Sequence, residues 1–287
     1  MRGHAASTVA TAVGPIEVAV YGQGPAVLLV HGLPGSWRQL LPLADDLAAD
    51  HTVVLPSRPG YGATPLRCGR TYGEQAAAYA ALLDALNLHA GAAVVGVSGG
   101  GPSAAAFAAA FPDRTTALVL ACPLAPDRIR IPPAMRVAAL RGVGEVLSAA
   151  ARARRRRQLA RPEERERLIR DELSPSEQAR LDDAMRAEVE RFFRSHLDAP
   201  PGLPGLRNDV AQARAARPFA GTVAAPTLVL HGDADTVVPA DHARAYAAAI
   251  PGAVIEILDG ASHGFLLTRR AEVVPRIARF LTQREPA

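Results

Sequence analysis

Residues 94–102 read VVGVSGGGP, an apolar run that ends on Ser98 between glycines and continues into an alanine-rich segment. This pattern predicts a strand, a sharp turn and a helix. A serine at such a turn takes a strained backbone conformation, and the small residues Gly96 and Gly100 are needed where strand and helix pass close together. Pro102 suits the first turn of the helix, where a missing N–H costs nothing. We therefore expect Ser98 to be held away from the sheet as a nucleophile.

Other glycine-rich motifs explain this stretch less well. The phosphate-binding pattern G-x-x-x-x-G-K-[ST] is absent, and so is the dinucleotide fingerprint G-x-G-x-x-G. A plain glycine-rich turn remains the alternative. The strand before Ser98 and the helix after it favour the nucleophile.

The composition indicates a globular chain with one large core. The 287 residues are 49% hydrophobic, which suffices for a single α/β domain or a domain with an insertion. The formal net charge is +4, but there is no lysine and every basic side chain is arginine, which we interpret as a compositional bias. The arginine-rich run at 152–157 precedes a mixed acidic and basic stretch, which is typical of a solvated helix face rather than a nucleic-acid site.

Cysteine usage and the N-terminus indicate an intracellular setting. The two cysteines, Cys68 and Cys122, have neither metal-ligand spacing nor the density of a disulfide scaffold, and we expect both to be reduced. The N-terminus lacks the continuous apolar segment of a signal peptide, and no apolar run approaches the roughly 18 residues needed to span a bilayer. We therefore expect a cytoplasmic protein without a membrane or nucleic-acid partner, and without a metal ion or cofactor.

Apolar runs alternate with helical patterns along most of the chain. This alternation predicts a doubly wound, mostly parallel sheet of the α/β class. Residues 8–13 and 16–21 predict an antiparallel hairpin at its edge. Further strands are predicted at 26–30, 52–55, 94–97, 116–120, 227–231 and 253–258.

The alternation stops at about residue 124 and resumes near 227. The intervening segment has no strand-like run but several polar helical stretches separated by prolines. We interpret residues 124–215 as an inserted helical cap, and residues 1–123 and 216–287 as the core. Such an insertion belongs over the carboxyl ends of the strands, where open α/β sheets bind ligands.

A serine hydroxyl needs a nearby base and an acid that orients the base. His263 lies in GASHGF (260–265), directly after a predicted strand. Asp235 lies in HGDADTVVP (231–239), which follows the strand predicted at 227–231. Asp233 in the same loop is the alternative candidate for the acid. Both loops leave the sheet at the edge where Ser98 is expected.

These stretches together resemble the α/β-hydrolase fold superfamily over nearly the whole chain, in the order Ser, Asp, His. HGLPG (31–35) is similar to the family's oxyanion loop, 96–100 to its nucleophile elbow, 232–235 to its acid loop and 262–264 to its histidine loop. SRPGYG (57–62) is similar to the loop after the second parallel strand, although Ser57 stands where the family often has aspartate.

The resemblance implies a role for each residue of the site. Ser98 would attack an acyl carbon, His263 would act as base and then as acid, and Asp235 would stabilise the imidazolium. The backbone N–H groups of Leu33 and Gly99 would form the oxyanion hole. The family spacing Gly-x-x-Asp favours Asp235 over Asp233, which we interpret as a turn-former.

Other residues near these loops have structural explanations. His31 and His231 are interpreted as hydrogen-bonding residues that organise loops, because two histidines are too few to indicate a metal site. Trp37, Tyr61 and Phe265 suit either a pocket wall or the core.

The activity that best fits a serine at the elbow is hydrolysis of a carboxylic ester through an acyl-enzyme, with a small-molecule acyl substrate. Relatives with an aspartate at the elbow, the haloalkane dehalogenases and epoxide hydrolases, are disfavoured. C–C bond hydrolases, aminopeptidases, perhydrolases and acyltransferases of the same fold remain alternatives. So does a receptor-like protein that binds a ligand and has a slow triad.

Overall fold

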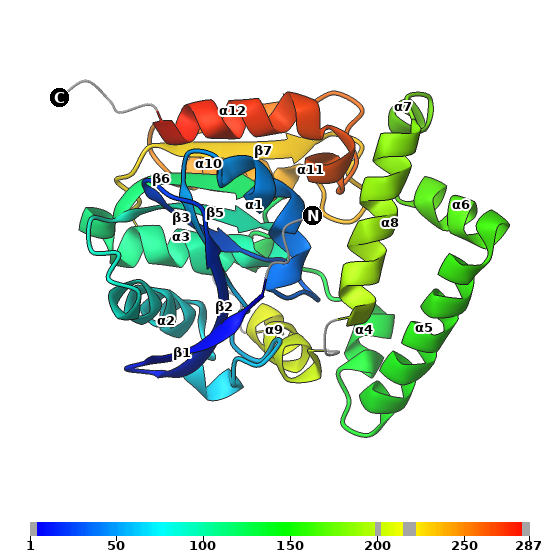
Figure 1. Ribbon diagram of the computed structural model, residues 1–287, viewed down its shortest axis with the longest axis horizontal. Coiled ribbons are helices and arrows are strands. Elements are labelled where there is room, and N and C mark those ends of the chain that lie inside the picture. The colour runs from blue at the N-terminus through cyan, green and yellow to red at the C-terminus, as the bar shows by residue number, and fades with distance from the viewer. Residues whose placement is uncertain (1–4, 199–201, 215–221, 283–287) are drawn as a thin grey trace.

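The computed structural model describes residues 5–198, 202–214 and 222–282, and its centre is a mostly parallel sheet (Figure 1). Strand β2 runs antiparallel to both of its neighbours, β1 and β4, and the other strands pair in parallel. The order across the sheet is β1-β2-β4-β3-β5-β6-β7-β8. The bounds are β1 Ser7–Thr11, β2 Gly14–Tyr21, β3 Ala26–Val30, β4 Thr52–Pro56, β5 Ala92–Val97, β6 Thr115–Ala121, β7 Thr227–Gly232 and β8 Val254–Leu258. The predicted fold class and edge hairpin are confirmed.

The register of the central strands brings the ends of several strands to one edge. Every residue of β3 and β5 is buried, as continuous apolar runs in a sheet covered on both faces should be. Val30 pairs with Gly96, and Val97 pairs with Ala121. Residues that directly follow β3, β5, β6 and β7 therefore lie close together at the carboxyl edge.

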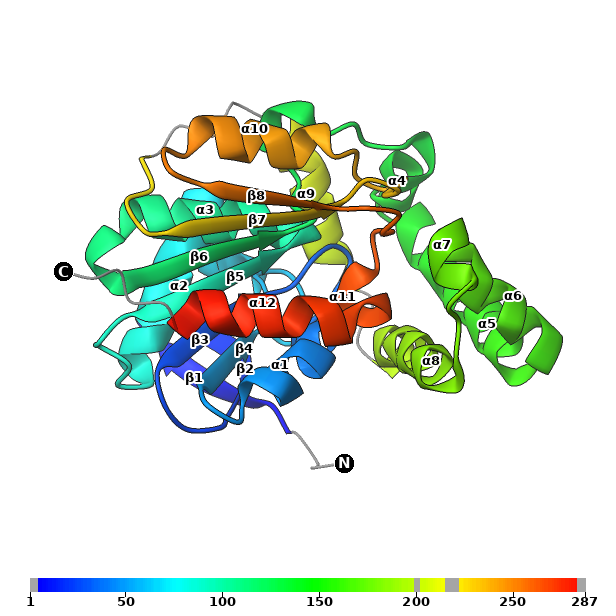
Figure 2. The ribbon, with the colours of Figure 1, turned by 90° about the horizontal axis from the view of Figure 1, so that it is seen from above.

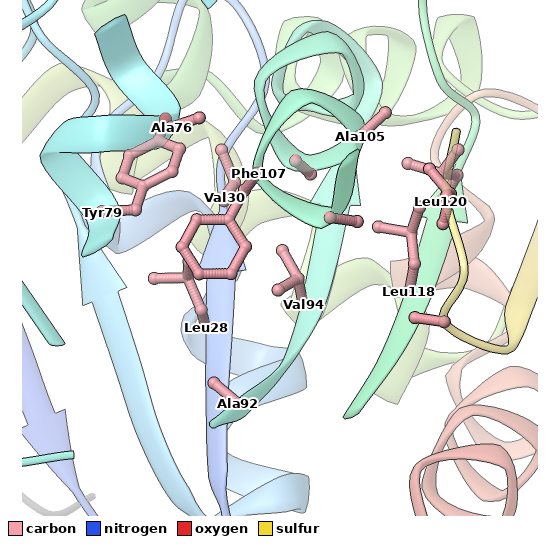
Figure 3. Close-up of a cluster of buried hydrophobic side chains, with 14 of the residues drawn as sticks. Leu28, Val30, Ala76, Tyr79, Ala92, Val94, Ala105, Phe107, Leu118 and Leu120 are labelled. Atoms are coloured by element: carbon pink, nitrogen blue, oxygen red, sulfur yellow. The ribbon is translucent and has the colours of Figure 1, made fainter. Parts of the chain in front are cut away.

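Helices cover both faces of the sheet (Figure 2). On one face lie α2 (Tyr72–Ala85), α3 (Gly101–Ala110) and α10 (Asp241–Ala249), and Figure 3 shows Tyr79 and Phe107 of this layer against Leu28, Val30 and Val94. On the other face lie α1 (Leu41–Leu47), α11 (Phe265–Thr268) and α12 (Arg270–Thr282). Two apolar layers thus hold the sheet rigidly beneath the site.

The helical insertion lies between β6 and β7. Its helices are α4 (Pro133–Ala138), α5 (Val143–Ala160), α6 (Pro162–Asp171), α7 (Pro175–Gln178), α8 (Asp183–Asp198) and α9 (Leu203–Arg214). In Figures 1 and 2, α5 to α8 stand beyond the end of the sheet toward which the arrow of β7 points. As predicted, the insertion is helical, and its residues 124–198 and 202–214 contain no strand. Its assignment as a separate cap domain stays a prediction. The boundary predicted between 215 and 216 lies outside the described residues.

Helix α9 is fixed to the sheet side of the molecule by a buried ion pair. Arg58 donates to both carboxylate oxygens of Asp209, at 3.2 and 2.8 Å, and the Tyr61 hydroxyl donates to the same carboxylate at 2.6 Å. Arg58 is 1% exposed and Asp209 6%. Because a buried charge that loses its partner destabilises a protein by about 3–5 kcal/mol, this pairing fixes α9 firmly.

Trp37, Tyr61 and Phe265, for which the sequence left open a pocket wall or the core, are all buried in the interior. Trp37 and Phe265 pack in the layer with α1 and α12. The Tyr61 ring lies edge-on to His31, with the ring centres 5.3 Å apart. Within the described part of the chain, no helix is long and apolar enough to cross a membrane.

Candidate active site

Ser98 follows β5 directly and begins the turn into α3. Its φ is +50°, a strained conformation for a residue with a side chain, and such strain is characteristic of functional sites. The neighbouring glycines are required by close contacts. A Cβ on Gly96 would lie 2.6 Å from the Cβ of Ala104, and one on Gly100 would lie 2.3 Å from the carbonyl oxygen of Val30. Strand, turn and helix thus stand as the motif predicts.

His263 and Asp235 form a hydrogen-bonded chain with Ser98. The Ser98 hydroxyl lies 3.1 Å from His263 Nε2, and His263 Nδ1 lies 2.7 Å from Asp235 Oδ2. Since an ionised carboxylate only accepts, Nδ1 carries the proton and Nε2 is free to accept from the serine. The other oxygen of Asp235 accepts from the backbone N–H groups of Val237 and Val238, at 2.9 and 2.8 Å.

The surroundings of this chain shift both pKa values. Burial alone would raise the pKa of Asp235, but hydrogen bonds from His231 and His263 outweigh it and hold the pKa below its ordinary value. Burial likewise disfavours the charged form of His263, yet the adjacent Cys122 and Asp235 raise the pKa of His263 well above 6.5. Asp235 is therefore ionised at neutral pH and favours the imidazolium that forms when His263 takes a proton.

The segment 31–35 lies against Ser98 and Gly99. A Cβ on Gly32 would approach the Cβ of Ser98 to 3.1 Å, and one on Gly99 would approach the Leu33 side chain to 2.3 Å. The backbone N–H of Gly32 donates to Gln39 Oε1 at 2.7 Å, which fixes the start of this loop. The two predicted oxyanion-hole residues, Leu33 and Gly99, are thus neighbours beside the serine.

The remaining polar residues of the loops hold backbone in place. His31 Nδ1 donates to the Gly32 carbonyl at 2.7 Å, and its Nε2 accepts from the backbone N–H of Arg58 at 2.9 Å. His231 Nε2 donates to the Val238 carbonyl at 2.8 Å. No group of three or more potential ligands that could hold a metal ion occurs among residues 5–198, 202–214 and 222–282.

Asp233 and Asp235 occupy different positions in their loop. Asp233 is exposed and accepts a hydrogen bond from the backbone N–H of Gly260 at 2.6 Å. Asp235 is 7% exposed and contacts His263 directly. The geometry thus places Asp235 against the histidine and gives Asp233 the role of a loop-stabilising residue.

A largely apolar cavity of about 380 Å³ opens onto Ser98 and His263. Helices and loops of the insertion contribute apolar side chains to its wall, namely Leu124, Ile129, Ile131, Pro132, Met135, Val189 and Phe192. Arg130 and Glu172 are charged residues on the same wall. Such a pocket suits an uncharged or mostly apolar group next to the reacting serine.

Comparison with known proteins agrees with this geometry. A family model described as the alpha/beta hydrolase fold matches residues 25–269. The chain belongs to this family. An alpha/beta hydrolase fold protein from Nakamurella multipartita superposes with a TM-score of 0.75 at 33% identity, covering 96% of this chain and 99% of that one.

Among the curated relatives of this α/β hydrolase are proteins named as an esterase and as a hydrolase. The pimeloyl-[acyl-carrier protein] methyl ester esterase of Chromobacterium violaceum is 30% identical over 267 residues, which is 92% of this chain and 97% of that protein. An uncharacterized hydrolase of Bacillus subtilis is 32% identical over 107 residues, but this match spans only 37% of each chain. The chain is therefore an enzyme, a hydrolase with esterase-like relatives.

Sequence analysis did not single out two residues of the hydrolase's site, Cys122 and Gln39. Cys122 follows β6, lines the cavity beside His263 and has a φ of +41°. Its place two residues after the strand predicted at 116–120 was the available signal, because that strand ends at the same edge as β5. Gln39 gave no signal, since its contact with Gly32 depends on how the chain turns after residue 35.

The arginine-rich part of α5 is only partly solvated. Arg154, Arg156 and Arg157 are exposed, as expected for a surface helix. Arg152 is half-buried and donates to the carbonyl groups of His196 and Leu197 at the end of α8. Arg155 lies over the Phe193 ring, 4.7 Å from its centre. These two arginines therefore join α5 to α8 and are not free surface charges.

Proposed function

We propose that this α/β hydrolase is a serine esterase that cleaves a carboxylic ester through an acyl-enzyme. The observation that carries the proposal is the hydrogen-bonded chain Ser98–His263–Asp235 at the floor of an apolar cavity. The ester-cleaving relative from Chromobacterium violaceum, matched over 92% of this chain, supports the same class of reaction.

In the first half-reaction, Ser98 Oγ attacks the ester carbonyl carbon while His263 Nε2 takes its proton. The negative charge develops on the carbonyl oxygen, next to the backbone N–H groups of Leu33 and Gly99. Gly99 lies in the first turn before α3, where the helix dipole favours negative charge. His263 then gives its proton to the leaving alkoxide, and the acyl group stays on Ser98.

In the second half-reaction, water attacks the acyl carbon and His263 acts as base again. Proton transfer back to Ser98 Oγ releases the carboxylic acid and restores the starting state. Throughout both steps Asp235 stays ionised, because its Oδ1 is held by two backbone N–H groups and its Oδ2 faces the protonated Nδ1.

We further propose that residues 124–215 act as a cap that selects the substrate. Its apolar side chains line the same cavity as Ser98. A cap in this position covers an acyl or alcohol group and excludes water, which strengthens the electrostatic interactions around Ser98.

Burst kinetics with a chromogenic ester tests the proposed function. Rapid mixing should release about one mole of alcohol per mole of enzyme in a burst, because the acyl-enzyme forms first. Steady turnover should follow as the acyl-enzyme is hydrolysed. A serine-directed phosphonate should label Ser98 and stop turnover. A burst without subsequent turnover would instead identify a receptor-like protein with a slow triad.

The pH dependence of kcat/KM should show an acid limb above pH 6.5. His263 accepts the serine proton only when neutral, and its pKa is raised well above 6.5. Activity should therefore fall as the pH drops through this raised value, which a pH series with a neutral ester reports for the free enzyme. Half-maximal activity below pH 6 would contradict the raised pKa of His263.

Replacing Phe192 by alanine should shift acyl-chain preference without removing activity. The Phe192 ring is part of the cavity wall, so the variant has a longer pocket. One methylene in such a pocket changes the free energy of binding by about 1–3 kcal/mol, and we expect the long-to-short ratio of kcat/KM to rise about tenfold.

A panel of chromogenic esters of increasing acyl length measures this ratio. Arg157→Ala is the matched control, since Arg157 is exposed on the same cap and does not line the cavity. An unchanged ratio in Phe192→Ala would refute the proposed role of the cap in selection.

A further inference from the structure

A buried carboxylate of the cap contacts the loop that carries His263. Glu177, in α7, is 1% exposed. Its Oε1 accepts a hydrogen bond from the backbone N–H of Ser262 at 3.3 Å and another from the Thr268 hydroxyl at 2.5 Å. Its Oε2 accepts from the backbone N–H of Ser174 at 3.0 Å. Oε2 thus accepts a hydrogen bond from within the cap, and Oε1 accepts hydrogen bonds from the segment around His263.

Two serines of the same cap turn hold the start of that segment. The Ser174 and Ser176 hydroxyls both donate to the carbonyl oxygen of Gly260, at 2.5 and 2.7 Å. The Arg269 side chain, 10% exposed, lies 3.8 Å from the Glu177 carboxylate and supplies positive charge beside it. Residues 260–268 are therefore held at both ends, and next to His263, by one short turn of the cap.

A second capping box in this chain shows what is unusual about Glu177. Glu74 at the start of α2 also closes a capping box, with Thr71, and accepts from the backbone N–H groups of Arg70 and Thr71. Glu74 is exposed and serves only its own helix. A capping box does not require burial, and burying a carboxylate is costly unless its oxygens are hydrogen-bonded. The burial of Glu177 is explained by its bonds to the histidine loop.

We propose that Glu177 is a positioning residue for His263, through which the cap holds the base in line with Ser98. The inference rests on the proposed triad mechanism. Glu177 does not touch the reacting atoms. It acts through the Ser262 N–H, one residue before His263, and through Thr268 at the end of the loop.

The geometry of the base is sensitive to such a displacement. The Ser98–His263 distance of 3.1 Å is already near the upper end for proton transfer. Displacing a catalytic group by 1 Å can reduce the rate by about 10²-fold. Loosening the loop would therefore reduce the rate of the chemical step more than it would weaken substrate binding.

The test compares Glu177→Ala and Glu177→Gln with the wild-type enzyme on a chromogenic ester. We expect Glu177→Ala to lose about 10²-fold in kcat, with KM changed less than twofold. Glu177→Gln keeps one acceptor oxygen for Thr268 and Ser262, but loses the charge and one backbone bond. The kcat of Glu177→Gln should lie between those of the wild type and Glu177→Ala, about fivefold below the wild type.

The pH profile supplies a readout that a purely stabilising role would not move. His263 faces two ionisable groups, Asp235 and Cys122. A histidine that has drifted from Asp235 loses part of what raises its pKa, so the acid limb of kcat/KM should move to lower pH in Glu177→Ala. The matched control is Glu74→Ala, which removes the same capping bond at the exposed site and should keep wild-type kcat and pH profile.

The outcomes separate this inference from the proposed function. If Ser98→Ala is inactive but folded Glu177→Ala has wild-type kcat and an unmoved acid limb, the positioning role is refuted and the triad stands. If Ser98→Ala hydrolyses the ester normally, the proposed function itself fails. Should Glu177→Ala not fold, Thr268→Val decides, because it removes the hydroxyl that donates to Glu177 Oε1, and wild-type kcat with an unmoved acid limb in that variant refutes the inference.

Discussion

Replacing Ser98 by alanine should reduce ester turnover by about 10⁶-fold while leaving the fold intact. The hydroxyl is the only group in the proposed mechanism that forms the acyl bond, and residual turnover would come from the oxyanion donors and from binding alone. Alanine keeps the Cβ of Ser98, and it has the same backbone strain at a φ of +50°. The thermal midpoint should therefore stay close to that of the wild type.

Steady-state hydrolysis of a chromogenic ester, with thermal unfolding measured on the same samples, checks this expectation. Phosphonate labelling gives the control: the wild type should incorporate one equivalent, and the alanine variant none. An alanine variant that retains turnover, or wild-type activity that resists the phosphonate, would show that the nucleophile lies elsewhere.

Asp235→Asn should lower kcat by about 10⁴-fold, because the amide reverses the histidine tautomer. The carbonyl oxygen of the asparagine will face the N–H groups of Val237 and Val238, which need an acceptor. Its NH₂ then faces His263 Nδ1 and forces that nitrogen to accept. The proton moves to Nε2, which can no longer take the proton of Ser98.

Asp233→Asn provides the matched control two residues away. Asp233 uses one oxygen to accept from the Gly260 N–H, and the asparagine carbonyl can accept the same bond. We expect less than a threefold change in kcat, in line with the small contribution of an exposed hydrogen bond. If the Asp233 variant loses activity and the Asp235 variant keeps it, the two aspartates exchange roles.

Much of the fold and of the candidate site could be predicted because the signals are local. At the turn around Ser98, a side chain at Gly96 or Gly100 would clash with neighbouring atoms, so the glycines of the motif can be recognised in the sequence. His263 and Asp235 follow apolar runs, and parallel strands bring their carboxyl ends to one edge. The Gly-x-x-Asp spacing favoured Asp235 over Asp233, and the hydrogen bond to His263 agrees.

Contacts between the insertion and the sheet could not be predicted in this way. Glu177 meets Ser262, and Asp209 meets Arg58, across 85 and 151 positions of sequence. No periodicity links such distant residues. The burial of Trp37, Tyr61 and Phe265 away from the cavity likewise depends on how the layers stack. Ser57, which departs from the family pattern, donates to Glu17 at 2.6 Å and has a structural role.

The buried pair between Arg58 and Asp209 has a consequence for protein engineering. A chimera that receives its cap from a relative without an acid at the Asp209 position would leave the Arg58 guanidinium buried without a counter-ion, next to the backbone that holds His31. Grafting only the stretch from α4 to α8 avoids that conflict, because α9 stays with its own sheet. Recombination breakpoints placed between α8 and α9 should therefore yield folded chimeras more often than breakpoints at the two ends of the insertion.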